Sequence, residues 1–375
     1  MPQKLPLGLQ DFREIIEGHY KYIDKTKYIH SIASRGKFYF LSRPRRFGKS
    51  LTISTLQALY QGSKTLFKGL WIEDKWDWNK KNPVLRITLA GIGFNETGLE
   101  AALHFVLDKI IRVHDLPPIH GGISSRFDQI IHLVSKKGKM VVLVDEYDAP
   151  IIQYLAKDMD KAYANRELLK EFYTVLKAND DLLKLVFLTG VSKFSKIGIF
   201  SGINNLVDLS THPAYANMLG YTQQELEANF SEEIDIAKDV LKLSREDFLE
   251  QLRVWYNGYK FHQKAEKVYN PVSINSFFDR NEFYNFWFAT GTPSFLVNLL
   301  KKEGTSRINL TPFNQNGFGC LHLHRISLEI VLFQTGFLTI GEKNEDDLVQ
   351  LIFPNKEVKN TFQEMQIEIL QPVDL

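Results

Sequence analysis

Apolar residues follow two alternating patterns along the first two-thirds of the chain. Short continuous runs rich in β-branched and aromatic residues are typical of buried strands. Longer stretches with apolar residues every three or four positions are typical of amphipathic helices. This alternation predicts βαβ units, and hence an α/β fold with a parallel sheet flanked by helices. The predicted strands are 37–42, 84–89, 140–144 and 183–189, and the predicted helices are 51–61, 99–113, 125–137 (with a Ser125…Asp128 capping box) and 165–177.

The pattern changes near residue 220, where helical spacing continues with short connections and without strand-like runs. Beyond about residue 305 the signals weaken into short apolar runs. We therefore expect a core at 1–214, a helical lid at 215–303 and a small C-terminal α+β segment at 304–375. The expected lid helices are 222–228, 232–243, 245–255 and 294–302, and the expected C-terminal elements are strands at 337–340 and 349–353 and a final segment at 360–369.

Composition removes several classes of function. The net charge of +2 provides no global field for nucleic acid or an anionic membrane. Cys320 is the single cysteine, which excludes an intramolecular disulfide and a multi-cysteine metal site. We find no signal peptide and no apolar stretch of the roughly 20 residues that a membrane span needs. A reducing cytoplasm is the expected location.

The charge is nevertheless uneven, because residues 25–72 contain ten Lys or Arg and no Asp or Glu. Within this region, FYFLSRPRRFGKS (38–50) places Gly48-Lys49-Ser50 between a predicted strand and a predicted helix. This is the context of a phosphate-binding loop. Gly48 would allow close approach of the backbone, Lys49 would contact the β- and γ-phosphates, and Ser50 would ligate Mg²⁺. The general loop pattern has glycine at position 43, whereas this chain has Arg43.

A second motif, VVLVDEYD (141–148), is a hydrophobic strand that ends in two carboxylates. Adjacent carboxylates after a core strand indicate a nearby cation, since their desolvation is costly. Asp145 is expected to hold Mg²⁺, and Glu146 to activate the water that attacks the γ-phosphate. The pair favours a hydrolase over a nucleotide kinase.

A third run, LVFLTGVSKF (185–194), leaves a predicted strand at Thr189. Thr189 and Ser192 are candidates for sensing the γ-phosphate, and Lys193 for stabilising charge in the transition state. The alternative is that Thr189 only caps the strand and that Lys193 is solvated.

Together these residues resemble the bacterial AAA-ATPase-like family, a group of P-loop NTPases related to STAND and archaeal ATPases. The resemblance covers most of residues 8–300. It rests on YIDKT (22–26), FLSRPRRFGKSL (40–51), LVDEYDAPI (143–151), LTGVSKFSKIGIFSGINNL (188–206), WYNGYKF (255–261), VYNP (268–271) and FATGTPSFL (288–296).

The resemblance implies ATP and Mg²⁺ as ligands and a loop that opens RPRRFGK instead of with glycine. Adenine is expected from the family, and the guanine-reading pattern N-K-x-D is absent. Tyr22, Asp24 and Lys25 would lie near the base. The residues it assigns to nucleotide binding are Arg43, Pro44, Arg45, Arg46, Phe47, Gly48, Lys49, Ser50 and Leu51, together with Gly291 and Pro293 from the turn that opens a lid helix, or that serves only as a helix-start turn.

Members of that family often carry a C-terminal nuclease-like domain of the PD-(D/E)xK class, preceded by a segment similar to 333–358. Because the sequence ends at Leu375, we expect this domain to be incomplete here. The predicted function is Mg²⁺-dependent ATP hydrolysis coupled to lid movement or to an unknown protein partner. The alternatives are an ATP-binding switch with little hydrolysis, or an accessory factor for DNA processing in contact with nucleic acid.

Overall fold

A five-stranded parallel sheet in the order β2-β3-β4-β1-β5 forms the centre of the molecule. The computed structural model describes residues 2–193, 199–200, 203, 205–289, 294–303, 323, 327–346 and 348–370. The strands of this sheet are β1 (Phe38–Ser42), β2 (Val84–Thr88), β3 (Met140–Asp145), β4 (Leu183–Gly190) and β5 (Val207–Asp208).

Burial explains why the strands could be located from sequence. β1 and β3 are buried along their whole length, as a continuous apolar run requires. β2 lies at the edge of the sheet and alternates buried with more exposed residues. Because all the strands are parallel, their carboxyl ends lie at one edge of the sheet. The order places β4 between β1 and β3, which brings three predicted motifs side by side.

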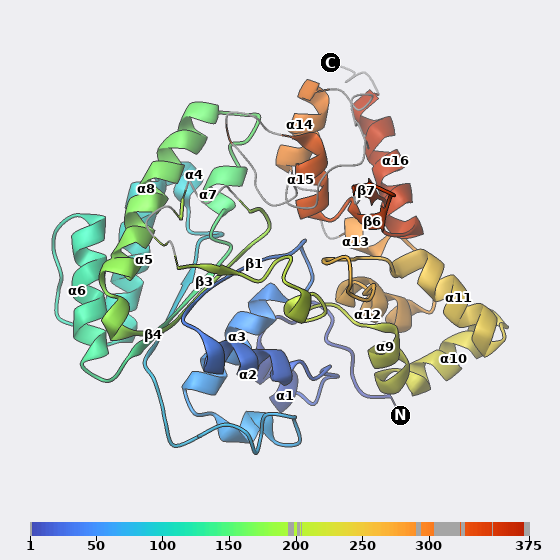
Figure 1. Ribbon diagram of the computed structural model, residues 1–375, viewed down its shortest axis with the longest axis horizontal. Coiled ribbons are helices and arrows are strands. Elements are labelled where there is room, and N and C mark those ends of the chain that lie inside the picture. The colour runs from blue at the N-terminus through green and yellow to red at the C-terminus, as the bar shows by residue number, and fades with distance from the viewer. Residues whose placement is uncertain are drawn as a thin grey trace.

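Helices α5, α6 and α8 lie on one side of the sheet and α1–α3 lie on the other (Figure 1). The helical elements of the core are α1 (Phe12–Glu17), α2 (Thr26–Arg35), α3 (Lys49–Tyr60), η1 (Lys64–Phe67), α4 (Phe94–Thr97), α5 (Leu99–Val113), α6 (Ile123–Ser135), α7 (Ala149–Ile152), α8 (Met159–Ala178), η2 (Asp180–Leu182) and η3 (Pro213–Tyr215).

The predicted capping box at Ser125 and Asp128 is wrong. α6 begins at Ile123 with Gly122 as its N-cap, so Ser125 already lies in the first turn. Burial of the Ile123 side chain favours this earlier start. Asp128 instead accepts a hydrogen bond of 2.8 Å from Asn179.

The lid helices form a hydrophobic core of their own, which includes Phe230, Phe248 and Phe277. α12 was not predicted from sequence, although Asn270 and Pro271 supply an N-cap and an N1 proline at its start. Two ion pairs join the lid to the N-terminal segment, Lys21 to Glu233 at 2.8 Å and Lys25 to Glu225 at 2.6 Å. The helices are α9 (Gln223–Asn229), α10 (Ser231–Leu241), α11 (Arg245–Tyr256) and α12 (Pro271–Arg280).

The C-terminal elements pack above the lid in Figure 1, and their apolar side chains join the core cluster of the sheet. α15 was not among the predicted elements. The strands β6 and β7 overlap the strands predicted at 337–340 and 349–353, and they form an antiparallel pair. Within the described ranges, no helix is long and apolar enough to cross a bilayer. The elements are α13 (Phe286–Ala289), α14 (Ser294–Glu303), α15 (Leu328–Thr335), β6 (Thr339–Lys343), β7 (Val349–Ile352) and α16 (Lys356–Leu370).

Candidate functional site

The loop between β1 and α3 has the geometry of a phosphate-binding loop. Gly48 is the N-cap of α3 and has φ +93°, a left-handed conformation that favours glycine. The Lys49 side chain is buried and folds back onto the loop, where its Nζ donates hydrogen bonds of 2.9 Å to the carbonyls of Arg43 and Pro44. Burial lowers the pKa of Lys49 to about 8. The N-terminus of α3 adds the partial positive charge that favours a phosphate group.

A cavity of about 300 Å³ opens in front of this loop. It is bounded by the loop, the N-terminal segment and the lid, so it lies where the core meets the lid. Its lining residues come from four parts of the chain. They include Arg45, Arg46, Gly48, Lys49, Ser50 and Leu51 from the loop and the start of α3, Glu146 directly after β3, Pro6 and Gln10 from the N-terminal segment, and Tyr221, Pro271 and Asn275 from the lid.

A narrow apolar slot of about 80 Å³ continues this cavity along α3. The two spaces share Gly48, Leu51 and Tyr221. Tyr22 and Lys25 line the slot, whereas Asp24, the third residue expected near a base, does not.

The arginines of the loop point in two directions. Arg45 and Arg46 line the cavity, and Arg46 has φ +68°. Arg43, Pro44 and Phe47 do not line it. The guanidinium of Arg43 is buried on the opposite side of the loop, and the ring of Phe47 packs edge-on against Tyr259 at 4.9 Å. Any contact of Arg43 with a phosphate in this conformation is therefore through its backbone.

The two carboxylates after β3 differ in environment. Asp145 is buried and accepts a hydrogen bond of 2.6 Å from the Thr189 hydroxyl and one of 3.1 Å from the Glu146 amide. Glu146 has φ +52°, a strained conformation for a non-glycine residue, and it faces the cavity. Burial and the adjacent Asp145 raise the pKa of Glu146.

Asp148 is a residue that the sequence analysis missed. Its buried carboxylate accepts hydrogen bonds from the Ser192 amide (2.6 Å) and the Val191 amide (3.2 Å), and from the Ser192 hydroxyl. Lys193 forms an ion pair with Asp208. Of the two sensor candidates, Thr189 is therefore bonded to Asp145 and Ser192 to Asp148, and Lys193, the candidate for transition-state charge, is paired with Asp208. The one sequence signal for Asp148 is a third acidic residue in DEYD.

A second cavity of about 310 Å³ lies beyond Glu146, between the ends of β2, β3 and β4. Arg45 and Glu146 line both cavities. The second cavity is also lined by Gly91, Asn95 and, from α14, Phe295. Gly291 and Pro293 lie outside the described residues.

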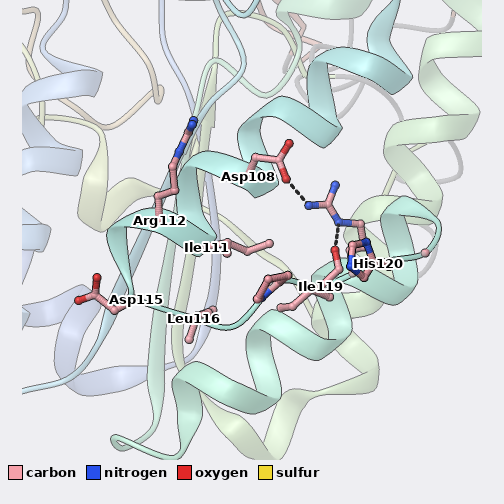
Figure 2. Close-up of a pocket in the computed structure, with 10 residues that line it drawn as sticks. Asp108, Ile111, Arg112, Asp115, Leu116, Ile119 and His120 are labelled. Atoms are coloured by element: carbon pink, nitrogen blue, oxygen red, sulfur yellow. Dashed lines mark hydrogen bonds and ion pairs between the residues drawn. The ribbon is translucent and has the colours of Figure 1, made fainter.

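A larger cavity of about 750 Å³ lies away from these groups, between α5, α6 and the connection that joins them. Figure 2 shows Asp108, Arg112 and His120 around it. Arg126, also in its lining, bonds to Asp108 and to the carbonyl of Ile119. None of the predicted site residues lines this cavity.

The residues near the loop suit a magnesium ion that shares a nucleotide's phosphates. In the part of the chain that the structure describes, no cluster of three or more His, Cys, Asp or Glu side chains could hold a metal alone. Asp145 is a buried carboxylate that takes part in none of the ion pairs among those residues, and its charge favours the protonated form of the nearby Lys49. Such a group favours a cation, and Ser50 at the start of α3 supplies a hydroxyl.

The strand order, the glycine-capped loop with Lys49, and the acidic end of β3 define the fold of a P-loop NTPase. The AAA-ATPase-like family, described as "Predicted AAA-ATPase", matches residues 6–200. The chain belongs to this family. It is also similar to an uncharacterized protein in the vnfD 5′ region of Azotobacter chroococcum mcd 1, with 38% identity over 371 residues that cover 96% of this chain and 69% of the relative.

Proposed function

We propose that this protein binds Mg²⁺–ATP in the cavity in front of α3 and hydrolyses it. The observation that carries the proposal is that the β1–α3 loop and Glu146 line one cavity at the carboxyl edge of the sheet. The phosphates would lie at the N-terminus of α3, where the amides and Lys49 favour anions. The base would enter the apolar slot beside Leu51 and Tyr22.

Each side chain then has a distinct role. Ser50 and Asp145 would hold Mg²⁺, whose chemistry is to neutralise charge on the phosphate oxygens. Glu146 takes a proton from the attacking water as the water oxygen bonds to the γ-phosphorus and the bond to the leaving oxygen of ADP breaks. Arg45 and Arg46 line the same cavity and can stabilise the charge that develops.

One observation also favours the second candidate, an ATP-dependent switch with little turnover. The Lys49 ammonium group donates to the carbonyls of Arg43 and Pro44, so a phosphate would take its remaining hydrogen or replace one of these carbonyls. Binding alone would then redistribute the hydrogen bonds that hold the loop. A switch would hold ATP without turnover above the buffer background, whereas an ATPase would release phosphate over many cycles.

The proposal is tested by releasing bound nucleotide from the gently purified protein and identifying it by mass, then measuring ATP affinity and phosphate release with and without Mg²⁺. We expect an adenine nucleotide, and a Lys49→Ala variant that binds none. If Lys49→Ala binds ATP as tightly as the parent, the phosphate site is misassigned.

A further inference from the structure

The RPRRF segment (43–47) has an inner and an outer side. Arg45 and Arg46 face the cavity, whereas Arg43, Pro44 and Phe47 contact the lid and the C-terminal segment. A Cβ built on Gly336, which follows α15, would lie 2.7 Å from the Pro44 ring, so this ring packs closely against the Gly336 backbone. The loop that is to hold phosphate is thus packed against segments that follow it by more than 160 residues.

Arg43 makes the strongest of these contacts. Its guanidinium donates hydrogen bonds to the Ser210 carbonyl (2.5 Å) and the Tyr215 carbonyl (3.2 Å), and its Cζ lies 4.0 Å from the centre of the Phe261 ring. Ser210 and Tyr215 belong to the connection that leads from β5 to the lid. A buried guanidinium depends on such partners, because leaving it unpaired is costly.

The backbone of Arg43 reaches the phosphate site directly. Its carbonyl and that of Pro44 hold Lys49 Nζ, each at 2.9 Å. The Arg43 backbone is held at its amide by the Gly190 carbonyl (3.2 Å) and through its side chain by the lid connection, so both anchors contribute to the positions of these two carbonyls. A glycine at this position, as in the general loop pattern, has no side chain with which to form such a link.

We propose that Arg43 is a positioning residue that couples the lid connection and Phe261 to the binding of phosphate by Lys49. This inference rests on the proposed ATP site. When the lid connection moves, the Arg43 carbonyl moves with it, and Lys49 is held or released. By thermodynamic reciprocity, ATP binding must then also stabilise the lid connection.

The C-terminal segment is part of the same link. The Gln334 side chain accepts a hydrogen bond of 3.1 Å from the amide of Lys193, which follows β4. The Thr339 hydroxyl accepts one of 2.7 Å from the amide of Lys260, next to Phe261. The path from Arg43 to β6 therefore runs through Phe261 and its neighbour Lys260, and the Gln334 bond joins α15 to the segment that follows β4.

The test compares two variants of the full chain at opposite ends of the link. Arg43→Lys keeps the charge but removes the planar fork that bonds two carbonyls. Phe261→Leu keeps a branched apolar side chain but removes the ring. Arg126→Lys is the matched control, because Arg126 is also buried and bonded to a carbonyl but lies at the distant cavity of Figure 2.

We expect ATP to bind roughly tenfold more weakly to Arg43→Lys and to Phe261→Leu, within the usual range of coupling between sites. Turnover at saturating ATP should stay within about twofold of the parent. The double variant should lose about as much affinity as one single variant, because the two residues act on the same link. A purely structural role would lower the active fraction, and hence turnover, without changing the affinity of the folded fraction.

Hydrogen exchange at saturating ATP provides the second measurement. In the parent and in Arg126→Lys, ATP should protect the amides of 209–216 and 257–261, and in Arg43→Lys this protection should be absent. Affinity and protection equal to those of Arg126→Lys in both variants would overturn the coupling role while leaving the ATP site intact. Failure of the parent itself to bind ATP would overturn both. If Arg43→Lys does not fold, Phe261→Leu decides the same question.

Discussion

The hydroxyl of Thr189 donates a hydrogen bond of 2.6 Å to the carboxylate of Asp145, across two neighbouring parallel strands. β4 lies between β1 and β3, and Thr189 is the register partner of Leu41 in the strand that leads into the phosphate-binding loop. The polar end of β4 therefore orients the proposed magnesium ligand.

Thr189→Val should remove the hydrogen bond that orients Asp145 while keeping the shape of the side chain at position 189. Loss of a donor to a buried carboxylate should destabilise the fold by about 1–3 kcal/mol. It should also raise the Mg²⁺ concentration needed for half-maximal ATP hydrolysis. Thr189→Ser retains the hydroxyl and serves as the control. An unchanged Mg²⁺ dependence in Thr189→Val would show that the hydrogen bond has no part in metal binding.

Lys49 should make ATP affinity depend on pH. In the free protein, burial lowers the pKa of Lys49 from 10.5 to about 8. The lysine is therefore charged below pH 8 and loses its charge as pH rises through this value. ATP affinity should therefore be lower at pH 9 than at pH 7, with a fall of at most about tenfold per pH unit above the pKa of Lys49.

A Lys49→Arg variant separates this effect from other titrations, because a guanidinium remains protonated over the same range. Its ATP affinity should be lower than that of the parent but should not fall between pH 8 and 9.5. The measurement is a titration of ATP at several pH values. Equal slopes for parent and variant would mean that another group titrates.

Glu146→Gln should separate binding from turnover. Glutamine cannot accept the proton of the attacking water, so phosphate release should fall about 100- to 10,000-fold while ATP still binds. Glu100→Gln, on the exposed face of α5, is the control and should match the parent. Turnover of Glu146→Gln within tenfold of the parent would exclude Glu146 as the base.

Asp148→Asn should destabilise the connection after β4. The carboxylate accepts from the amides of Val191 and Ser192 and from the Ser192 hydroxyl, and an asparagine would replace one acceptor oxygen with a donor. The free energy of unfolding in urea should fall by about 2–3 kcal/mol. Ser192→Ala, which removes only the hydroxyl bond, should cost about 1 kcal/mol. Equal losses of unfolding free energy in the two variants would show that the Asp148 bonds to the two amides do not stabilise this connection.

Glu357 should make the stability of the fold depend on pH. It is fully buried at the start of α16, where it accepts hydrogen bonds of 2.8 Å from Ser273 and from the Trp287 amide. Burial raises its pKa from 4.5 to about 7. Between these values the folded state holds a proton that the unfolded state has released, so this residue's contribution to stability decreases as pH rises from 4.5 to 7.

The free energy of unfolding should decrease by up to about 1.4 kcal/mol for each pH unit in that interval. Glu357→Gln should abolish this decrease, so that urea unfolding of this variant changes less between pH 5 and pH 7 than unfolding of the parent. Glu364→Gln, on the exposed face of the same helix, keeps Glu357 and should retain the parental dependence. If both variants have the same dependence, Glu357 does not titrate in this interval.

Local patterns were sufficient to predict four of the five strands of the sheet and the helices α3, α5, α6 and α8, but not β5, α1 or α2. β1, β3 and β4 are continuous apolar runs because parallel strands are buried on both faces. The start of α6 and the existence of α12 and α15 could not be predicted in the same way. α15 is apolar nearly all round, so it has no helical stripe to detect, and it is buried against other elements of the C-terminal segment.

The amino-acid sequence alone determined the chemistry available to the site: a glycine-lysine-serine turn before a helix and two carboxylates after a strand, in the order that a P-loop NTPase requires. Only the tertiary structure decided the direction of each side chain. Arg43 points away from the cavity because its side chain bonds to Ser210 and Tyr215 and packs on Phe261. These partners lie more than 160 residues further along the chain, so local sequence could not reveal them. A side chain's direction follows from burial and hydrogen bonding among residues that only the fold brings together.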